Sequence, residues 1–407
     1  MNADPLHDEI ADLHHQHHTP NYAPELLFVK GEGSYLWDSE GRRILDFVSG
    51  IAVTSLGHSH PAMVETLKTQ GPRLMHVSNL YYNDQAPRLA EELNEMTLGG
   101  KVFFCNSGAE ANEGLIKIAR KWGSDKGKHD IVTMRNSFHG RTLATLTATG
   151  QDKVQKGFEP LPSGFVYADF NDLDSVKAAC SDQTAAVLLE VLQAEGGVLP
   201  ADPEFITGLA EFCKEQDILL LIDEVQTGVG RTGICFAYKH YGIVPDGISL
   251  AKGLGGGFPI GAVVCGPRIQ DVFSPGSHGT TFGGQPLACA MARTVLRVFK
   301  EERLCLHARE MGKLLTELLL PVVEEFDFIT ALRGQGLLQG LVINQPAKEL
   351  EQLLVKRGLL TVCTTGNVIR MLPPLNVTPE QIRDAATHIS DACADWRNGL
   401  SPQGTNT

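Results

Sequence analysis

Residues that can do chemistry follow four short apolar runs of this sequence. Asp223 and Lys252 each come directly after such a run, Ser107 and Gly108 follow a third and open a helical pattern, and Phe138 lies shortly after a fourth. Because parallel strands gather ligands at their carboxyl ends, we expect these side chains at one edge of a sheet. The set combines a carboxylate, an amine, a flat aromatic ring and a helix start whose free N–H groups attract anions.

This combination matches the needs of pyridoxal 5′-phosphate. The cofactor needs a lysine for a Schiff base, a carboxylate for its pyridinium nitrogen, an anion cradle for its phosphate and a flat group against its ring. Lys252, Asp223, Ser107 with Gly108, and Phe138 could supply these groups. Taken singly, each has an ordinary explanation, because strand-end aspartates usually cap helices, lysines are usually exposed and phenylalanines are usually core. The prediction depends on their occurring together.

The apolar runs alternate with longer segments of helical periodicity. This alternation predicts an α/β fold with a mostly parallel central sheet and helices on both faces. Residues 25–46 alternate apolar and polar side chains around glycines and predict a short antiparallel meander. We expect a large α/β domain at 55–299, a smaller α+β domain at 300–407, and an N-terminal segment at 1–54 that packs with the smaller domain. The expected strands are residues 101–105, 130–133, 186–189, 218–222, 247–250 and 261–265, with further short strands at 336–343, 359–365 and 368–374.

The composition is that of a folded globular protein, with 43% hydrophobic and 20% charged residues among 407. A net charge of −13 argues against nonspecific binding to nucleic acid or membranes, because both need a positive surface. Nine scattered cysteines without a CxxC pair are typical of reduced intracellular thiols. The N-terminus has neither a signal-peptide nor a transit-peptide pattern, so we expect a cytoplasmic protein. We interpret the histidines at 14, 15, 17 and 18 as part of a solvated segment and predict no metal site.

Seven motifs resemble, in their order along the chain, those of the class III (fold-type I) pyridoxal-phosphate-dependent aminotransferases. They are GIAVTSLGHSHP at 50–61, NSGAEANE at 106–113, SFHGRT at 137–142, LIDEVQTGVGRTG at 221–233, SLAKGLGGGFPIGA at 249–262, HGTTFGGQPLA at 278–288 and RMLPPL at 370–375. The resemblance covers nearly the whole chain and is nearest to the branch of the family that acts on N-acetylornithine. It implies the fold-type I architecture and a homodimer with active sites at the subunit interface.

The resemblance also implies how the cofactor is held. Lys252 would carry it covalently and move the proton of the reaction, while Asp223 would pair with the pyridinium nitrogen. Ser107 and Gly108 would bind the phosphate within their own subunit, and Thr281 would reach the phosphate of the partner subunit. By the same resemblance, the ring would be framed by Phe138, Val225 and Gln226, the last of them near the phenolic oxygen.

Four further residues would meet the substrates. Arg370 is the expected clamp for a carboxylate, because a planar guanidinium binds a carboxylate through two hydrogen bonds. Glu195 would neutralise Arg370 when no such carboxylate is present, and Arg141 and Thr280 would meet the acetylornithine end. The sequence departs from the family at 190–195, where EVLQAE lacks the usual proline and glycine. We therefore expect an altered loop around Glu195.

The implied activity moves the δ-amino group of N-acetylornithine to 2-oxoglutarate in two half-reactions, with ping-pong kinetics. The products would be N-acetylglutamate 5-semialdehyde and glutamate, as in arginine biosynthesis. Ornithine δ-aminotransferases carry a tyrosine where Ile51 stands here. Isoleucine cannot form a hydrogen bond with a free α-amino group, which favours an acylated nitrogen. Succinylornithine, ornithine and 4-aminobutyrate are the alternative amines.

Three other classes of function also merit comparison. An aminomutase on the same fold would need no 2-oxoglutarate, and Glu195 with Arg370 argues against it. A nucleotide-dependent dehydrogenase is suggested by the glycines at 253–257, but a dinucleotide-binding motif would need glycine where Phe258 stands. A noncatalytic relative would be marked by loss of Lys252 or Asp223, and both residues are present.

Overall fold

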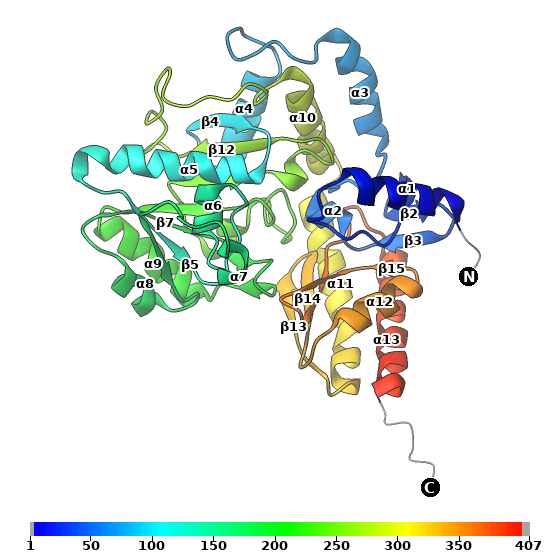
Figure 1. Cartoon of the computed structure of the whole chain (residues 1–407). Helices are drawn as coiled ribbons and strands as arrows, with labels where there is room; N and C mark the ends of the chain where they lie inside the picture. Colours follow the sequence, from blue (N-terminus) through cyan, green and yellow to red (C-terminus); the bar gives the residue numbers. More distant parts are fainter. Residues whose placement is uncertain (1–3, 401–407) are drawn as a thin grey trace.

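The computed structural model describes residues 4–400 and is organised around a seven-stranded sheet (Figure 1). The strand order is β4 (Lys101–Cys105), β12 (Gly261–Cys265), β11 (Gly247–Leu250), β10 (Leu219–Asp223), β7 (Thr184–Leu189), β5 (Asp130–Met134) and β6 (Phe165–Ala168). β12 is antiparallel to both of its neighbours, and all other adjacent pairs are parallel. The carboxyl ends of β4, β11, β10 and β5 therefore lie along one edge of the sheet.

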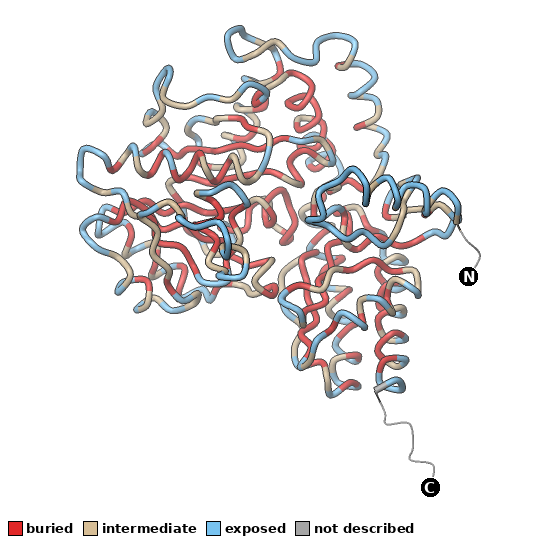
Figure 2. Tube along the Cα trace, in the orientation of Figure 1, coloured by how far each residue is buried: buried red, intermediate tan, exposed pale blue. Residues whose placement is uncertain are grey.

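Helices cover both faces of this sheet. Leu219 and Leu221 of β10 belong to the hydrophobic cluster that includes α5 (Gly108–Gly123), whereas Leu220 and Ile222 belong to the cluster that includes α9 (Pro203–Glu215). Successive side chains of a strand point to opposite faces, so α5 and α9 lie on opposite sides. Figure 2 shows the result, with buried strands between helices whose outer surfaces are exposed.

An N-terminal meander is joined to the C-terminal part of the chain. β1 (Phe28–Glu32), β2 (Tyr35–Asp38) and β3 (Arg43–Asp46) pair antiparallel in sequence order. The fourth strand of this sheet is β15 (Leu359–Leu360), which pairs parallel with β3. The first fifty residues are thus hydrogen-bonded to a strand some three hundred residues later.

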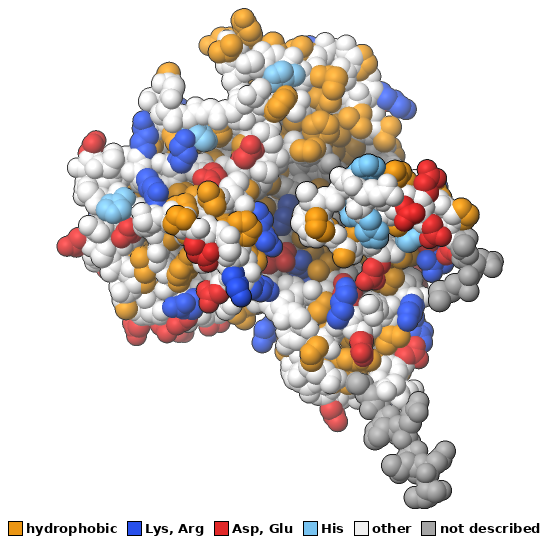
Figure 3. Space-filling view, viewed as in Figure 1, with side chains coloured by type: hydrophobic (Ala, Val, Ile, Leu, Met, Phe, Trp, Pro, Cys, Tyr) orange, Lys and Arg blue, Asp and Glu red, His pale blue; other side chains and the backbone are white. Residues whose placement is uncertain are grey.

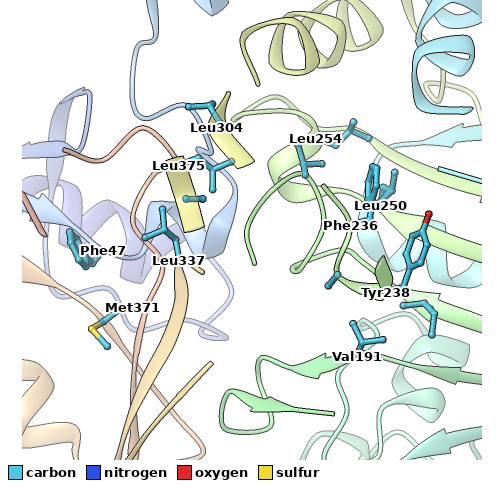
Figure 4. Close-up of a cluster of buried hydrophobic side chains, with 14 of the residues drawn as sticks. Phe47, Val191, Phe236, Tyr238, Leu250, Leu254, Leu304, Leu337, Met371 and Leu375 are labelled. Carbon is cyan, nitrogen blue, oxygen red and sulfur yellow. The ribbon is translucent and has the colours of Figure 1, made fainter. Parts of the chain in front are cut away.

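The C-terminal part contains an antiparallel sheet and three helices. The sheet order is β13 (Ile329–Gln335), β14 (Leu338–Ile343), β17 (Val368–Met371) and β16 (Val362–Thr364). Helices α11 (Leu304–Glu325), α12 (Lys348–Lys356) and α13 (Pro379–Leu400) pack beside it, and α11 follows α10 (Pro286–Glu301) after a short break. Apolar side chains of the C-terminal part and of the seven-stranded sheet belong to one buried cluster, part of which Figure 4 shows.

The remaining elements are short or lie at the periphery. Among residues 4–400, no helix is long and apolar enough to cross a membrane. The remaining short or peripheral elements are α1 (Pro5–His17), α2 (Ser49–Ala52), α3 (Pro61–Arg73), α4 (Ala86–Met96), α6 (Leu143–Ala148), α7 (Asp152–Gln155), α8 (Leu173–Ala179), the hairpin of β8 (Leu192–Gln193) and β9 (Leu199–Pro200), and the 3₁₀ turns η1 (Ser124–Lys126), η2 (Ala237–Tyr241) and η3 (Lys252–Leu254).

The predicted α/β class with a mostly parallel sheet is confirmed. The histidine-rich segment forms helix α1, with Asp4 capping its first turn, and none of the residues of α1 is buried, as expected of a solvated segment. Two details differ. Strands β6, β8, β9 and β13 were not expected from the sequence. The single strand expected at 359–365 is two strands, β15 and β16, because its halves pair in different sheets.

Candidate active site

The carboxyl ends of four strands surround a cavity of about 410 Å³. Its size lies within the range of small-molecule sites in proteins. The cavity brings together nine of the twelve site residues predicted from the sequence. They are Ser107, Gly108, Phe138, Arg141, Glu195, Asp223, Val225, Gln226 and Lys252.

Asp223 is the best-fixed carboxylate of the cavity. It ends the fully buried strand β10, and its Oδ2 accepts hydrogen bonds from Asn112 Nδ2 at 2.7 Å and His139 Nδ1 at 2.8 Å. Its Oδ1 accepts a hydrogen bond from the backbone N–H of Val225 at 2.9 Å. This arrangement fixes the orientation of a negative charge at the cavity wall.

Lys252 enters the cavity from the neighbouring strand. It follows β11 and opens the turn η3 with a φ of 45°, in the left-handed region that residues other than glycine rarely adopt. Burial lowers the pKa of its amine, although the nearby carboxylates of Glu195 and Asp223 oppose this effect. A lower pKa increases the neutral fraction of the amine, which is the form that can act as a nucleophile or base.

The N-terminus of α5 forms another wall. Ser107 is its N-cap, with the side-chain oxygen accepting from the N–H of Glu110 at 3.2 Å, and Gly108 begins the helix. A Cβ atom on Gly108 would lie 2.7 Å from Cγ1 of Val225, so only glycine fits between the helix and the segment after β10. The first N–H groups of a helix lack acceptors within it and therefore suit an anion such as phosphate.

Phe138 lines the cavity, as Val225 does, and is half-buried. Its backbone N–H donates to Oε2 of Glu190 at 3.0 Å. The exposed guanidinium of Arg141 lies 5.6 Å from the centre of the Phe138 ring. The cavity wall thus contains an aromatic ring with a cation close to it.

Arg370 and Glu195 form an ion pair behind the cavity. Arg370 lies on β17 and is 1% exposed, and its Nη1 donates to Glu195 Oε1 at 2.6 Å and to Gln226 Oε1 at 3.1 Å. Although burial alone would raise the pKa of Glu195, the Arg370 guanidinium holds it below its ordinary value. Nε and Nη2 of Arg370 have no hydrogen-bond partner within the described residues. The loop expected to be altered at 190–195 still places Glu195 against Arg370, and Thr364 Oγ1 anchors it by donating to the Glu195 carbonyl at 2.7 Å.

Thr280 and Thr281 do not line the cavity of their own chain. They line a neighbouring pocket of about 440 Å³ together with Asn106, which borders both spaces. Thr280 Oγ1 accepts a hydrogen bond from Asn106 Nδ2 at 3.3 Å, and Thr281 is exposed. Ile51 also lies outside the cavity lining, although its neighbour Val53 is part of it.

Three buried polar residues of the site were not assigned a role from the sequence. Asn112 and His139 hold Asp223, and Glu190 lines the cavity beside Phe138. Burial, and then the charge of Asp223, raises the pKa of Glu190 well above its ordinary value. The sequence did carry a signal for them, because Asn112 and His139 lie within the motifs at 106–113 and 137–142 and Glu190 directly follows a predicted strand.

These residues fit pyridoxal phosphate. The cavity places a carboxylate held by three donors, a lysine of lowered pKa, an aromatic face and a helix start without room for a side chain around one space. Lys252 would hold the aldehyde, Asp223 the ring nitrogen, and Ser107 with Gly108 the phosphate. Among residues 4–400 there is no group of three or more His, Cys, Asp or Glu side chains placed to bind a metal ion.

Comparison with known proteins identifies the relatives of this chain. A family model described as "Aminotransferase class-III" matches residues 17–393. The chain is 48% identical over 376 residues to an acetylornithine aminotransferase from Caldanaerobacter subterraneus subsp. tengcongensis, covering 91% of this chain and 95% of the relative. It is 44% identical over 385 residues to a succinylornithine transaminase from Yersinia pseudotuberculosis, covering 91% and 93%. The crystal structure of the ornithine aminotransferase from Toxoplasma gondii ME49 superposes with a TM-score of 0.93 at 32% identity, covering 98% of this chain and 97% of that one.

Proposed function

Because the chain belongs to the class III aminotransferases, which depend on pyridoxal phosphate, we propose that it transfers the δ-amino group of N-acetylornithine to 2-oxoglutarate. The products are N-acetylglutamate 5-semialdehyde and glutamate, and the proposed pathway is arginine biosynthesis. The observation that carries the proposal is the cavity in which Lys252 and Asp223 converge beside the pair of Glu195 and Arg370.

Lys252 is the proposed proton carrier of both half-reactions. When bound, the cofactor withdraws electrons from the bonds around the nitrogen that is transferred. The buried amine of Lys252, with its lowered pKa, would take a proton from the substrate carbon bonded to the nitrogen and deliver it to the cofactor's aldehyde carbon, which is bonded to the same nitrogen. Asp223 supports this chemistry by presenting a fixed negative charge to the protonated ring nitrogen.

The ion pair of Glu195 and Arg370 is proposed to distinguish the two substrates. 2-Oxoglutarate carries a carboxylate next to its reacting carbon, whereas the δ end of N-acetylornithine does not. When 2-oxoglutarate binds, Glu195 moves aside and the guanidinium of Arg370 binds the carboxylate through the donors that have no partner within residues 4–400. When the amine binds, Glu195 remains on Arg370 and cancels its charge.

The acylated end of the amine is proposed to lie at the rim of the cavity. Arg141 supplies a cation there for the α-carboxylate. Ile51, two residues before the cavity residue Val53, has an apolar side chain that cannot satisfy the hydrogen bonds of a free α-amino group, which favours the acetylated substrate over ornithine. The relative that is named a succinylornithine transaminase supports succinylornithine as the second candidate.

We further propose that the enzyme is a cytoplasmic homodimer in which Thr281 and Thr280 complete the site of the partner subunit. Thr281 is exposed outside its own cavity, beside Phe282, whose side chain is 57% exposed. The loop after α3 exposes further large apolar side chains, and Figure 3 shows hydrophobic groups on the side that carries α3. They include Met75, Leu80, Tyr81 and Tyr82. Exposed apolar patches of this kind mark protein interfaces.

The test is a comparison of amines with the purified enzyme saturated with pyridoxal phosphate. N-acetylornithine, succinylornithine, ornithine and 4-aminobutyrate are supplied separately with 2-oxoglutarate, and glutamate formation gives kcat/KM for each. We expect the highest kcat/KM for N-acetylornithine and at least about a tenfold lower value for ornithine, the equivalent of losing one well-placed contact.

Lys252→Ala is the control, and it should remain folded without producing glutamate from any amine. If succinylornithine gives the highest kcat/KM, the proposed substrate is wrong while the aminotransferase assignment stands. Equal turnover of ornithine and N-acetylornithine would remove the argument from Ile51.

A further inference from the structure

Two cysteines lie in contact where the segment after β10 meets the start of α11. Cys305 Sγ donates a hydrogen bond to Cys235 Sγ, and the two sulfur atoms are 3.3 Å apart. Both side chains are half-buried, and both are free thiols in this structure. A disulfide needs about 2.0 Å between the sulfur atoms, so a small movement of the two side chains would suffice to form one.

The surroundings favour a thiolate at Cys235. The hydrogen bond from Cys305 lowers the pKa of Cys235, against the effect of burial, and the charges of Lys239 and Lys300 lower it further. The pKa of Cys305 is raised, because its proton is held in the same hydrogen bond. The thiolate is the reactive form of cysteine, so the pair consists of an attacking sulfur and a resolving sulfur.

The pair also joins two structural parts that already meet there. Arg309 of α11 donates from Nε and Nη2 to the carbonyl oxygen of Gly233, at 3.2 and 3.1 Å. Gly230 N–H donates to the carbonyl oxygen of Cys235 at 3.1 Å, which folds the segment into a compact loop. This loop continues directly from Val225 and Gln226 in the cavity wall. A bond between the two sulfurs would therefore hold the loop on α11 covalently.

We propose that Cys235 and Cys305 form a redox-active dithiol that a low-molecular-weight disulfide, such as oxidised glutathione, converts to an intramolecular disulfide. The Cys235 thiolate attacks one sulfur of the small disulfide, forming a mixed disulfide and releasing one thiolate. Cys305 then loses its proton and attacks Cys235 Sγ, which releases the second thiolate. The protein loses two electrons and two protons, and the small disulfide becomes two thiols.

The test exposes the purified holoenzyme to oxidised glutathione, unfolds it in denaturant so that the buried cysteines are accessible, blocks the remaining thiols by alkylation and measures the intact mass. The alkylated count should fall from nine to seven, and peptide mapping should find residues 235 and 305 linked. The oxidised protein should also unfold at a higher temperature, because the cross-link restricts the unfolded chain, and a reducing agent should reverse both changes.

Single variants separate the two roles. Cys305→Ser should stop at the mixed disulfide and gain one glutathione on Cys235, whereas Cys235→Ser should form no disulfide. Cys363→Ser is the matched control, because Cys363 is also half-buried but its pKa is raised, chiefly by burial, with no contribution from another cysteine; in this variant residues 235 and 305 should still become linked, and the alkylated count should fall from eight to six. Nine alkylated thiols after treatment of the wild type, or equal glutathione uptake by the two single variants, would overturn the proposal.

Discussion

Both carboxylate oxygens of Asp223 are engaged by the protein itself, from three different segments of the chain. Asn112 comes from α5, His139 from the turn after β5 and Val225 from the segment after β10. A carboxylate that only caps a helix accepts from the first turn of that helix. The additional donors indicate that the position and orientation of the charge matter, as they do for a group that must face one atom of a ligand.

Asp223→Asn tests this role. The variant removes the charge and gives His139 and Asn112 one acceptor fewer, while the side-chain volume is retained. We expect a folded protein whose kcat falls roughly 100-fold or more, in line with the loss of an electrostatic group that acts in the transition state. Steady-state kinetics with N-acetylornithine and thermal unfolding measure the two effects. Asp246→Asn is the control, because Asp246 accepts from the N–H of Leu220, three residues before Asp223, and does not line the cavity; the kcat of this variant should be unchanged. A near-normal rate for Asp223→Asn would contradict the proposed pairing.

Glu224, the next residue, predicts a pH dependence of stability. Its side chain is buried and accepts from Thr227 Oγ1 at 2.6 Å and from Tyr238 N–H at 2.8 Å. Burial raises its pKa from 4.5 to about 7. The folded state therefore binds this proton more tightly than the unfolded chain, and the stabilisation, on the order of 3 kcal/mol, is complete below about pH 4.5 and lost as the pH rises through about 7.

Glu224→Gln has no proton to lose at this position. We expect its thermal midpoint, measured relative to the wild type, to rise between pH 5 and pH 8.5, because only the wild type is destabilised by ionisation. The midpoints of both proteins at several pH values in this range provide the measurement. A constant difference between the two proteins across the range would show that the carboxyl does not titrate there.

At the scale of the elements, the contact between α5 and the segment after β10 determines where the first N–H groups of α5, which would bind the phosphate, are placed. Gly108→Ala places a Cβ 2.7 Å from Cγ1 of Val225, closer than real Cβ contacts, so the helix start must shift. We expect about a tenfold or greater loss of affinity for pyridoxal phosphate, measured by titrating the apoenzyme, because the N–H groups that would bind the phosphate move with the helix.

Val225→Ala in the same chain removes the atoms that collide. The double variant should recover most of the lost affinity, whereas Val225→Ala alone should reduce it slightly through loss of contact with the ring. If the double variant binds the cofactor no better than Gly108→Ala, the defect does not arise from this contact.

The elements predicted from the sequence were those with continuous apolar runs. β4, β11 and β12 occupy the predicted residues. β11 and β12 are buried along their whole length, and a short continuous apolar run is typical of such strands. β6 was missed because Phe165–Ala168 is a short edge strand with partly exposed residues and little contrast to its neighbours. His139 and Asn112 were not assigned a role for a different reason, since a buried polar residue reveals its role through its partner, and the partner that they share, Asp223, is distant from both in the sequence. The proposed boundaries at 54/55 and 299/300 fall near α2 and the break between α10 and α11.

At the scale of the whole molecule, the site of a single chain is incomplete if Thr281 binds the phosphate of the cofactor in the partner subunit. One chain contributes a cavity with Lys252 and Asp223, and its Thr281 lies exposed outside that cavity. Dimers with two-fold symmetry would bring each Thr281 to the other cavity. Two variants that are defective for different reasons can then compensate for each other, but only across subunits.

Mixed dimers of Lys252→Ala and Thr281→Ala provide that test. Lys252→Ala alone should be inactive, and Thr281→Ala alone should bind the cofactor weakly and retain about a tenth of the activity. In a hybrid dimer, one site combines both substitutions, while the other combines an intact Lys252 with an intact Thr281 and is wild type. Random reassortment of equal amounts makes half of the dimers hybrids, so about a quarter of all sites should be restored. If Thr281 instead acted within its own chain, every site in the mixture would carry one of the two substitutions. Mixing would then restore no activity, which distinguishes a shared site from a dimer of independent ones.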